Sequence, residues 1–153
     1  LAVDMLDAFV ATAEDGVQSA GAELVKSIGD AVMVAADTPR AAILAVQHVF
    51  EASYSTDSFP EPRAGLHHGP VIARNDDYFG ATVNLAARVA SKAGSGQAFA
   101  TGSILAAAGE LGLDVVQLGP YDLRECSSRS SSGPSRYPRP TWTCPSIPSA
   151  ACA

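Results

Sequence analysis

Apolar and polar positions at the start of the chain predict one helix followed by a β-hairpin. Residues 1–13 repeat apolar side chains every three or four positions, which is the spacing of one helical face. Gly16 and the small residues after it indicate a loop or a short second helix. Residues 23–28 and 31–36 are short, largely apolar segments joined by a Gly-Asp pair. Because Gly29 can adopt the positive φ of a tight turn, these two segments predict a hairpin.

The middle of the chain predicts a second helix and then a strand. Asp37 or Thr38 can cap the helix, and Pro39 lies in its first turn, where a missing N–H has little cost. The apolar positions continue to about Tyr54, and a loop containing two prolines follows. Residues 63–73 then carry apolar and small side chains in an extended pattern, which predicts one strand.

The stretch 75–93 changes from a polar turn to an amphipathic helix. Asn-Asp-Asp forms the turn, two aromatics and Gly80 follow, and the helix ends before a Gly-Ser-Gly breaker. Asn84 and Arg88 are four residues apart and therefore lie together on one side of this helix. An amide and a guanidinium so placed suit an anionic ligand, although a solvated surface pair has the same spacing. The predicted apolar face is a neighbouring one, made of Val83, Ala86, Ala87 and Ala90.

The rest of the predicted domain alternates short strands with one helix, and a tail of different composition follows. Strands are predicted at residues 97–100 and 113–118, with a short helix at 103–108 between them. The succession of helices, hairpins and strands indicates an α+β domain over residues 1–124. Residues 125–153 are dominated by Ser, Pro and Arg without a periodic apolar face, which predicts a disordered tail.

Composition fits one globular domain and excludes several classes of partner. The 153 residues are 47% hydrophobic and 17% charged, which is enough apolar material for a sizeable core. A net charge of −6 and a pI of about 4.8 leave no basic footprint for nucleic acid. No apolar run reaches the roughly 18 residues of a membrane span. The three cysteines, Cys126, Cys144 and Cys152, lack metal-ligand spacing and favour a reducing, cytoplasmic setting. We expect any membrane tether to lie elsewhere in a longer protein.

Two motifs resemble those of the class III nucleotidyl cyclase catalytic domain, the family of adenylate and guanylate cyclases. The family's K-x-x-G-D hairpin is matched by Lys26, Gly29 and Asp30. Two multi-residue motifs in family order are far more specific than a lone glycine pattern. The resemblance covers residues 1–124 and implies a ferredoxin-like mixed sheet with covering helices. The family's D-Y-F-G-x-x-V-N-x-A-x-R segment is matched by Asp77, Tyr78, Phe79, Gly80, Val83, Asn84, Ala86 and Arg88.

The resemblance also implies a reaction and a dimeric site. In this family two protomers meet head to tail, and the nucleotide lies at their interface. The ribose 3′-hydroxyl attacks the α-phosphate and releases pyrophosphate. Two Mg²⁺ or Mn²⁺ ions held by two aspartates lower the pKa of the hydroxyl and neutralise phosphate charge. Asp30 matches the second of these aspartates, although an Asp in a hairpin turn is also common turn chemistry.

Four residues match positions that bind the nucleotide in this family. Lys26 and Asp77 match the pair that recognises adenine, since a Lys donates to a ring nitrogen and a carboxylate accepts from the exocyclic amine. Guanine presents the opposite pattern, so this pair favours ATP over GTP. Asn84 matches the residue that positions the ribose, and Arg88 the one that stabilises charge on the α-phosphate in the transition state. Outside the family context, Lys26 also fits a solvent-facing lysine at a strand edge.

The family's first metal aspartate has no match in this sequence. It lies on a strand before the first helix, in a pattern like F-x-D-I-x-G-F, whereas Asp4 and Asp7 lie within the predicted helix. We therefore expect that strand upstream of Leu1, and no activity from this chain by itself. Three hypotheses stay open. In the first, the chain is part of an adenylate cyclase, with a guanylate cyclase as the alternative. In the second, it is a non-catalytic nucleotide-binding module that dimerises with a complete cyclase domain. In the third, it is a fold relative without a nucleotide role.

Overall fold

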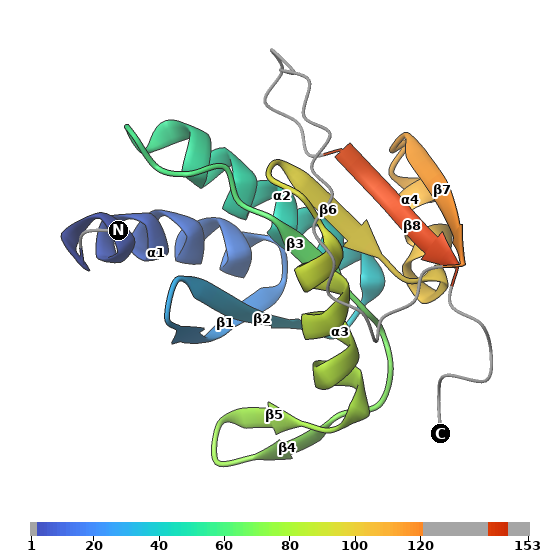
Figure 1. The fold of residues 1–153 in the computed structure, drawn as a ribbon. Coiled ribbons are helices and arrows are strands. Elements are labelled where there is room, and N and C mark those ends of the chain that lie inside the picture. The colour runs from blue at the N-terminus through green and yellow to red at the C-terminus, as the bar shows by residue number, and fades with distance from the viewer. Residues whose placement is uncertain (1–2, 121–140, 147–153) are drawn as a thin grey trace.

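The computed structural model describes residues 3–120 and 141–146 and confirms the predicted α+β class (Figure 1). α1 and α2 pack side by side, and α3 runs along β3 and β6. In chain order the elements are α1 (Val3–Ser19), β1 (Ala22–Ile28), β2 (Ala31–Ala36), α2 (Pro39–Ser55), β3 (Ala64–Leu66), β4 (Ile72–Arg74), β5 (Asp77–Phe79), α3 (Ala81–Lys92), β6 (Gln97–Ala100), the 3-10 turn η1 (Gly102–Ile104), α4 (Leu105–Glu110), β7 (Val115–Pro120) and β8 (Thr141–Ser146).

Parallel and antiparallel strands are both present, as the resemblance implies, but they are divided among three sheets. β1 and β2 form one antiparallel hairpin, and β4 and β5 form another. The remaining sheet has four strands in the order β3-β6-β8-β7, all of them parallel. A tight turn returns the chain antiparallel, whereas a crossover that includes a helix, such as α3 between β3 and β6, returns it parallel.

The predicted hairpin and second helix are confirmed, and together with α1 they enclose one part of the core. Gly29 has a φ of 62° in the turn between β1 and β2. Thr38 caps α2, because its Oγ1 accepts the N–H of Ala41 at 3.2 Å, and Pro39 begins the helix. The buried side chains between α1 and α2 are Phe9, Ala13, Val17, Ala45, Val49 and Ala52.

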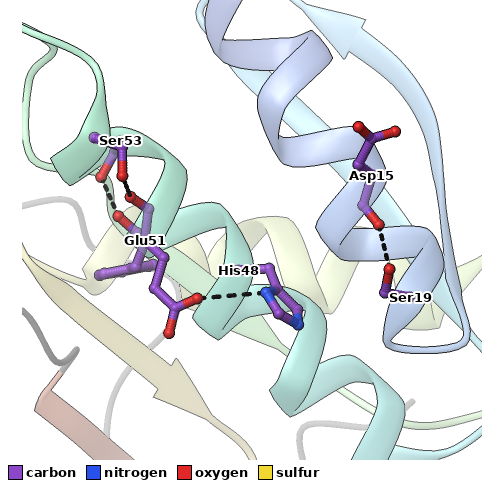
Figure 2. A network of polar contacts seen from close by, with 7 residues as sticks. Asp15, Ser19, His48, Glu51 and Ser53 are labelled. Atoms are coloured by element: carbon purple, nitrogen blue, oxygen red, sulfur yellow. Dashed lines mark hydrogen bonds and ion pairs between the residues drawn. The ribbon is translucent and has the colours of Figure 1, made fainter.

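α1 continues to Ser19, so the loop or second helix predicted near Gly16 is wrong. A Cβ on Gly16 would lie 2.7 Å from the Cβ of His48 on α2, so the two helices approach closely at this point. Packing therefore outweighs the usual cost of a glycine within a helix. Figure 2 shows the polar groups of this helix pair, where Ser19 Oγ donates to the Asp15 carbonyl at 2.8 Å. His48 pairs with Glu51 at 3.4 Å.

The single strand predicted over residues 63–73 is wrong in its middle. β3 and β4 are separate strands, and the loop 67–71 lies between them. Pro70 has no N–H to donate to a sheet, so a continuous strand is disfavoured there. β4 pairs with β5 instead, through a turn in which Asn75 and Asp76 have φ angles of 52° and 57°. Positive φ at both positions is what a type I′ hairpin turn requires.

α3 has the predicted span, but it buries a different face. Thr82 and Val89 are buried, whereas Ala87, which was predicted to be buried, is exposed. The other predicted apolar positions are half-buried. The cause is the contact with β3, where a Cβ on Gly65 would lie only 2.1 Å from the backbone N of Ala90. This backbone contact sets the rotation of the helix, and apolar periodicity alone does not reveal it.

β8 lies within the segment predicted to be disordered, so that prediction is corrected for Thr141–Ser146. The strand pairs in parallel with both β6 and β7. Backbone hydrogen bonds stabilise such a strand without a periodic apolar face, and Thr and Trp have high strand propensity. The sheet therefore extends past the predicted domain boundary at residue 124. The other residues of the segment 125–153 lie outside the described part of the chain, where the division into domain and tail stays a prediction.

Candidate active site

Lys26 and Asp77 are 51 residues apart in the sequence and form an ion pair in the structure. The register of β1 shifts between Leu24 and Lys26, and a bulge of this kind re-aims the side chain that follows it. Lys26 Nζ donates to Asp77 Oδ2, and the Tyr78 N–H donates to Asp77 Oδ1 at 2.8 Å. The two side chains keep 38% and 24% of their surface exposed, so a ligand can reach the pair.

The pKa of Asp77 lies below its ordinary value of 3.8, because the hydrogen bond from Lys26 and then the one from the Tyr78 N–H stabilise the carboxylate. A lowered folded-state pKa stabilises the fold above the unfolded-state pKa, and this contribution disappears as the pH falls through the folded value. We therefore expect the pair to be intact at neutral pH and to open only at a pH below the ordinary carboxyl pKa of 3.8.

NMR titration of the Asp77 carboxyl carbon measures this expectation. Lys26→Met should return the Asp77 pKa toward 3.8, because it removes the largest cause of the shift. Arg40→Met, at an exposed position on α2, is the matched control and should leave the titration unchanged. A midpoint at or above the ordinary value in the unmodified chain would contradict the pairing.

An exposed apolar patch adjoins the ion pair. Phe79 follows Asp77 by two positions, so both side chains lie on the same face of β5. Lys26 Nζ lies 5.8 Å from the centroid of the Phe79 ring, within cation–π range. Phe79 is 48% exposed, and its cross-strand partner Ile72 is exposed as well. We call Ile72 and Phe79 the hairpin patch.

Asn84 and Arg88 lie one turn apart on the exposed side of α3, as predicted. Gly80, with a φ of 122°, separates β5 from α3, and the Asn84 N–H donates to its carbonyl at 3.2 Å. Because Thr82 and Val89 occupy the buried side of the helix, the amide and the guanidinium face solvent. Their catalytic roles stay predictions.

Asp30 lies in the turn of the β1–β2 hairpin and is exposed. Among the side chains that the structure describes, no group of three or more from His, Cys, Asp or Glu could hold a metal ion. Mg²⁺ commonly takes one or two carboxylates and completes its shell with waters and substrate phosphates. Asp30 therefore fits one position in such a shell, and its role as a metal ligand stays a prediction.

Sequence reasoning missed the contacts that hold the loop between β3 and β4. Thr82 Oγ1 donates to the Pro70 carbonyl at 2.5 Å. His67 Nδ1 lies 2.8 Å from Thr101 Oγ1, which ties the start of the loop to the end of β6. Burial, and then the neighbouring His68, lower the pKa of His67, so this imidazole is neutral at pH 7. Thr82 occupies an unspecified position of the motif, and no sequence spacing signals these contacts.

The sequence that carries this site matches one known protein family. A family model described as the adenylate and guanylate cyclase catalytic domain matches residues 1–133. The chain belongs to that family. In this cyclase domain the matched range includes all five residues that the motifs predict for the site. Among the described residues, no helix combines the length and apolar character needed to cross a bilayer.

Individual relatives of this chain include a protein named as an adenylate cyclase. The cyclase domain is 39% identical over 88 residues to an adenylate cyclase from Streptomyces coelicolor, covering 58% of this chain and 23% of that protein. An uncharacterized protein from Mycobacterium tuberculosis is 40% identical over 101 residues, covering 66% of this chain and 27% of its own length. This cyclase domain thus spans about a quarter of the length of these curated relatives.

A solved structure supports the fold of this cyclase domain. The crystal structure of an adenylate/guanylate cyclase/hydrolase from Silicibacter pomeroyi is similar to it, with a TM-score of 0.53 and 24% sequence identity. The similarity covers 63% of this chain and 61% of the other. At this identity the comparison shows a shared fold, and the substrate has to be argued from the residues of this chain.

Proposed function

We propose that this cyclase domain is part of an adenylate cyclase whose complete dimeric site converts ATP to cyclic AMP and pyrophosphate in intracellular signal transduction. The observation that carries the proposal is the contact between Lys26 and Asp77. An ammonium group can donate to the N1 atom of adenine, and a carboxylate beside it can accept from the exocyclic amine. Guanine would place its N1–H against the Lys26 donor and its carbonyl oxygen against the Asp77 acceptor. The pair therefore favours ATP.

In this proposal, α3 supplies the residues that contact the phosphate and ribose of the substrate. The reaction forms a bond between the ribose 3′-oxygen and the α-phosphorus and breaks the bond to the pyrophosphate oxygen. Arg88 would stabilise the charge that develops on the α-phosphate, and Asn84 would hold the ribose. β5 and α3 are joined by Gly80 alone, so one short segment of chain carries Asp77 together with both of these residues.

A divalent ion fits the same proposal. Mg²⁺ or Mn²⁺, when bound, would lower the pKa of the ribose 3′-hydroxyl and neutralise phosphate charge. Asp30 would supply one carboxylate ligand from its exposed turn. Substrate phosphates, waters and a second carboxylate from outside the described residues would complete the shell.

A second protomer is the other component of the proposed active site. The hairpin patch of Ile72 and Phe79 is exposed beside the ion pair, and exposed aromatic and aliphatic side chains of this kind suit an interface. The dimer would be a homodimer or a heterodimer with another cyclase domain. The alternative function is a non-catalytic module that lends base recognition to a complete partner, and it rests on the same contact between Lys26 and Asp77.

Lys26→Glu is expected to abolish the preference for ATP over GTP. Losing one base contact and leaving its partner unpaired should cost on the order of 1–3 kcal/mol of binding free energy, which is roughly 5- to 150-fold in affinity. Competition of ATP and GTP against a fluorescent ATP analogue measures the preference. Arg40→Glu, with the same charge reversal at an exposed position on α2, should leave it unchanged. Equal affinity of the unmodified chain for both nucleotides would refute the proposal.

A further inference from the structure

The β4–β5 hairpin that carries Asp77 is joined to the rest of the domain by two short segments, residues 67–71 before β4 and Gly80 after β5. We call these two segments the neck. Figure 1 shows the hairpin extending beyond the N-terminal end of α3. Pro70 lies just before the hairpin and Thr82 just after it, in the first turn of α3. The hydroxyl of Thr82 donates to the Pro70 carbonyl at 2.5 Å, which links the two ends of the neck. Thr82 is only 9% exposed, so water competes poorly for this bond.

Gly69 and Gly80 show why the hydroxyl matters at this neck. A Cβ on Gly69 would lie 2.8 Å from Thr82 Oγ1, so the glycine leaves the space that the hydroxyl occupies. Gly80 has a φ of 122°, a conformation that side-chain-bearing residues rarely adopt, and nothing would contact a Cβ there. No side chain therefore packs at Gly80, where the chain leaves the hairpin, and another contact is needed to orient the hairpin relative to α3.

We infer that Thr82 is a positioning residue whose hydroxyl closes the neck of the hairpin and so holds Asp77 against Lys26. The hairpin would otherwise be free to turn about the glycine that follows it, and its face that carries Asp77 would shift relative to β1. The same bond fixes Asp77 relative to Asn84 and Arg88, because Thr82 is on the helix that carries them. Only the expected effect of this bond on ATP binding rests on the proposed function.

Two substitutions separate the hydroxyl from the bulk of the side chain. Thr82→Val keeps the volume and branching without the donor, whereas Thr82→Ser keeps the donor. In the valine variant, amide hydrogen exchange at Tyr78 and Phe79 should accelerate on the order of tenfold, as for the loss of one hydrogen bond. NMR titration should show the Asp77 pKa rising toward 3.8, and serine should restore both values.

Thr12→Val is the matched control. Thr12 Oγ1 makes the same kind of bond to the Ala8 carbonyl, at 2.9 Å within α1, so its loss should leave both hairpin measurements unchanged. Three results would overturn the inference. They are unchanged exchange and titration in Thr82→Val, equal losses in the valine and serine variants, or exchange that accelerates as much in α1 and α2 as in the hairpin.

These measurements use no nucleotide, so their outcome is independent of the proposed function. ATP affinity is then measured on the same variants with the fluorescent analogue. We expect a loss of about five- to tenfold in Thr82→Val that serine recovers. If the hairpin measurements change as expected while no variant binds ATP, the positioning role stands and the proposed function fails.

Discussion

Arg88→Ala is expected to reduce cyclic AMP synthesis by roughly 100- to 1,000-fold in a mixed dimer that takes its arginine from this chain. The mixture combines this chain with a complete cyclase domain whose own equivalents of Asn84 and Arg88 have been replaced. The partner then supplies both metal aspartates, and this chain supplies base recognition and the phosphate clamp. A guanidinium aimed at the charge that develops on the α-phosphate contributes more to the transition state than to substrate binding.

The expected loss should appear in turnover and not in the stability of the chain. Arg88 is exposed on α3, so truncating it removes no buried packing. Arg40→Ala, an exposed arginine on α2, is the control and should preserve both activity and melting temperature. Arg88→Lys should recover little, since an ammonium cannot reproduce the planar fork that grips two phosphate oxygens.

This chain without the partner should form no detectable cyclic AMP. Its sequence matches one of the family's two metal aspartates, and a two-metal displacement needs carboxylates for both ions. Robust synthesis by this chain alone would show that the metal ligands have been misassigned. A mixed dimer that stays fully active with Arg88→Ala would show that this arginine does not contact the phosphate.

Gly65→Ala should destabilise the domain by about 3 kcal/mol, which is the upper range for overpacking a core. An added Cβ would lie 2.1 Å and 2.5 Å from the backbone N and Cα of Ala90, and 2.6 Å from the Ala86 carbonyl oxygen. These are backbone atoms within α3 and cannot move aside as a flexible side chain can. The helix would have to shift off β3, and Asn84 and Arg88 would move with it.

Thermal or urea unfolding of the purified chain measures this effect. Gly109→Ala is the control, because nothing lies within 4 Å of a Cβ at that position in α4. Alanine should be neutral there or stabilise the helix by up to about 1 kcal/mol. If Gly65→Ala unfolds at the same denaturant concentration as the unmodified chain, the close contact between α3 and β3 does not exist in solution.

Local signals in the sequence were sufficient for several elements. The Gly29 turn, the Thr38 cap with Pro39, and the strand at residues 97–100 all appear as predicted. The turn and the cap depend on dihedral preferences or hydrogen bonds between near neighbours, and these act in the same way wherever the segment lies. The strand follows its local propensity, although its ladder partners β3 and β8 are distant segments. The predicted spans of α2 and α3 hold for the same reason.

Other features depended on contacts with distant segments. Gly16 remains helical because α1 packs closely on α2, and Ala87 is exposed because α3 is rotated by its contact with β3 at Gly65. β8 forms where composition predicted disorder, because two other strands satisfy its backbone hydrogen-bonding groups. Helical periodicity and composition contain no information about which partner a segment will meet.

Some features of the candidate active site were likewise predictable from the sequence, whereas others depended on the tertiary structure. The sequence alone determined which residue types are present and, through two motifs, the family to which they belong. The resemblance also implied that Lys26 and Asp77 act on one base. Only the tertiary structure shows that the two side chains contact each other directly across 51 residues of chain, and that Thr82 bonds to the Pro70 carbonyl beside them. Motif spacing describes neighbours along the chain. A contact between two hairpins depends instead on how bulges, glycines and packed helices orient them, and the folded chain determines these together.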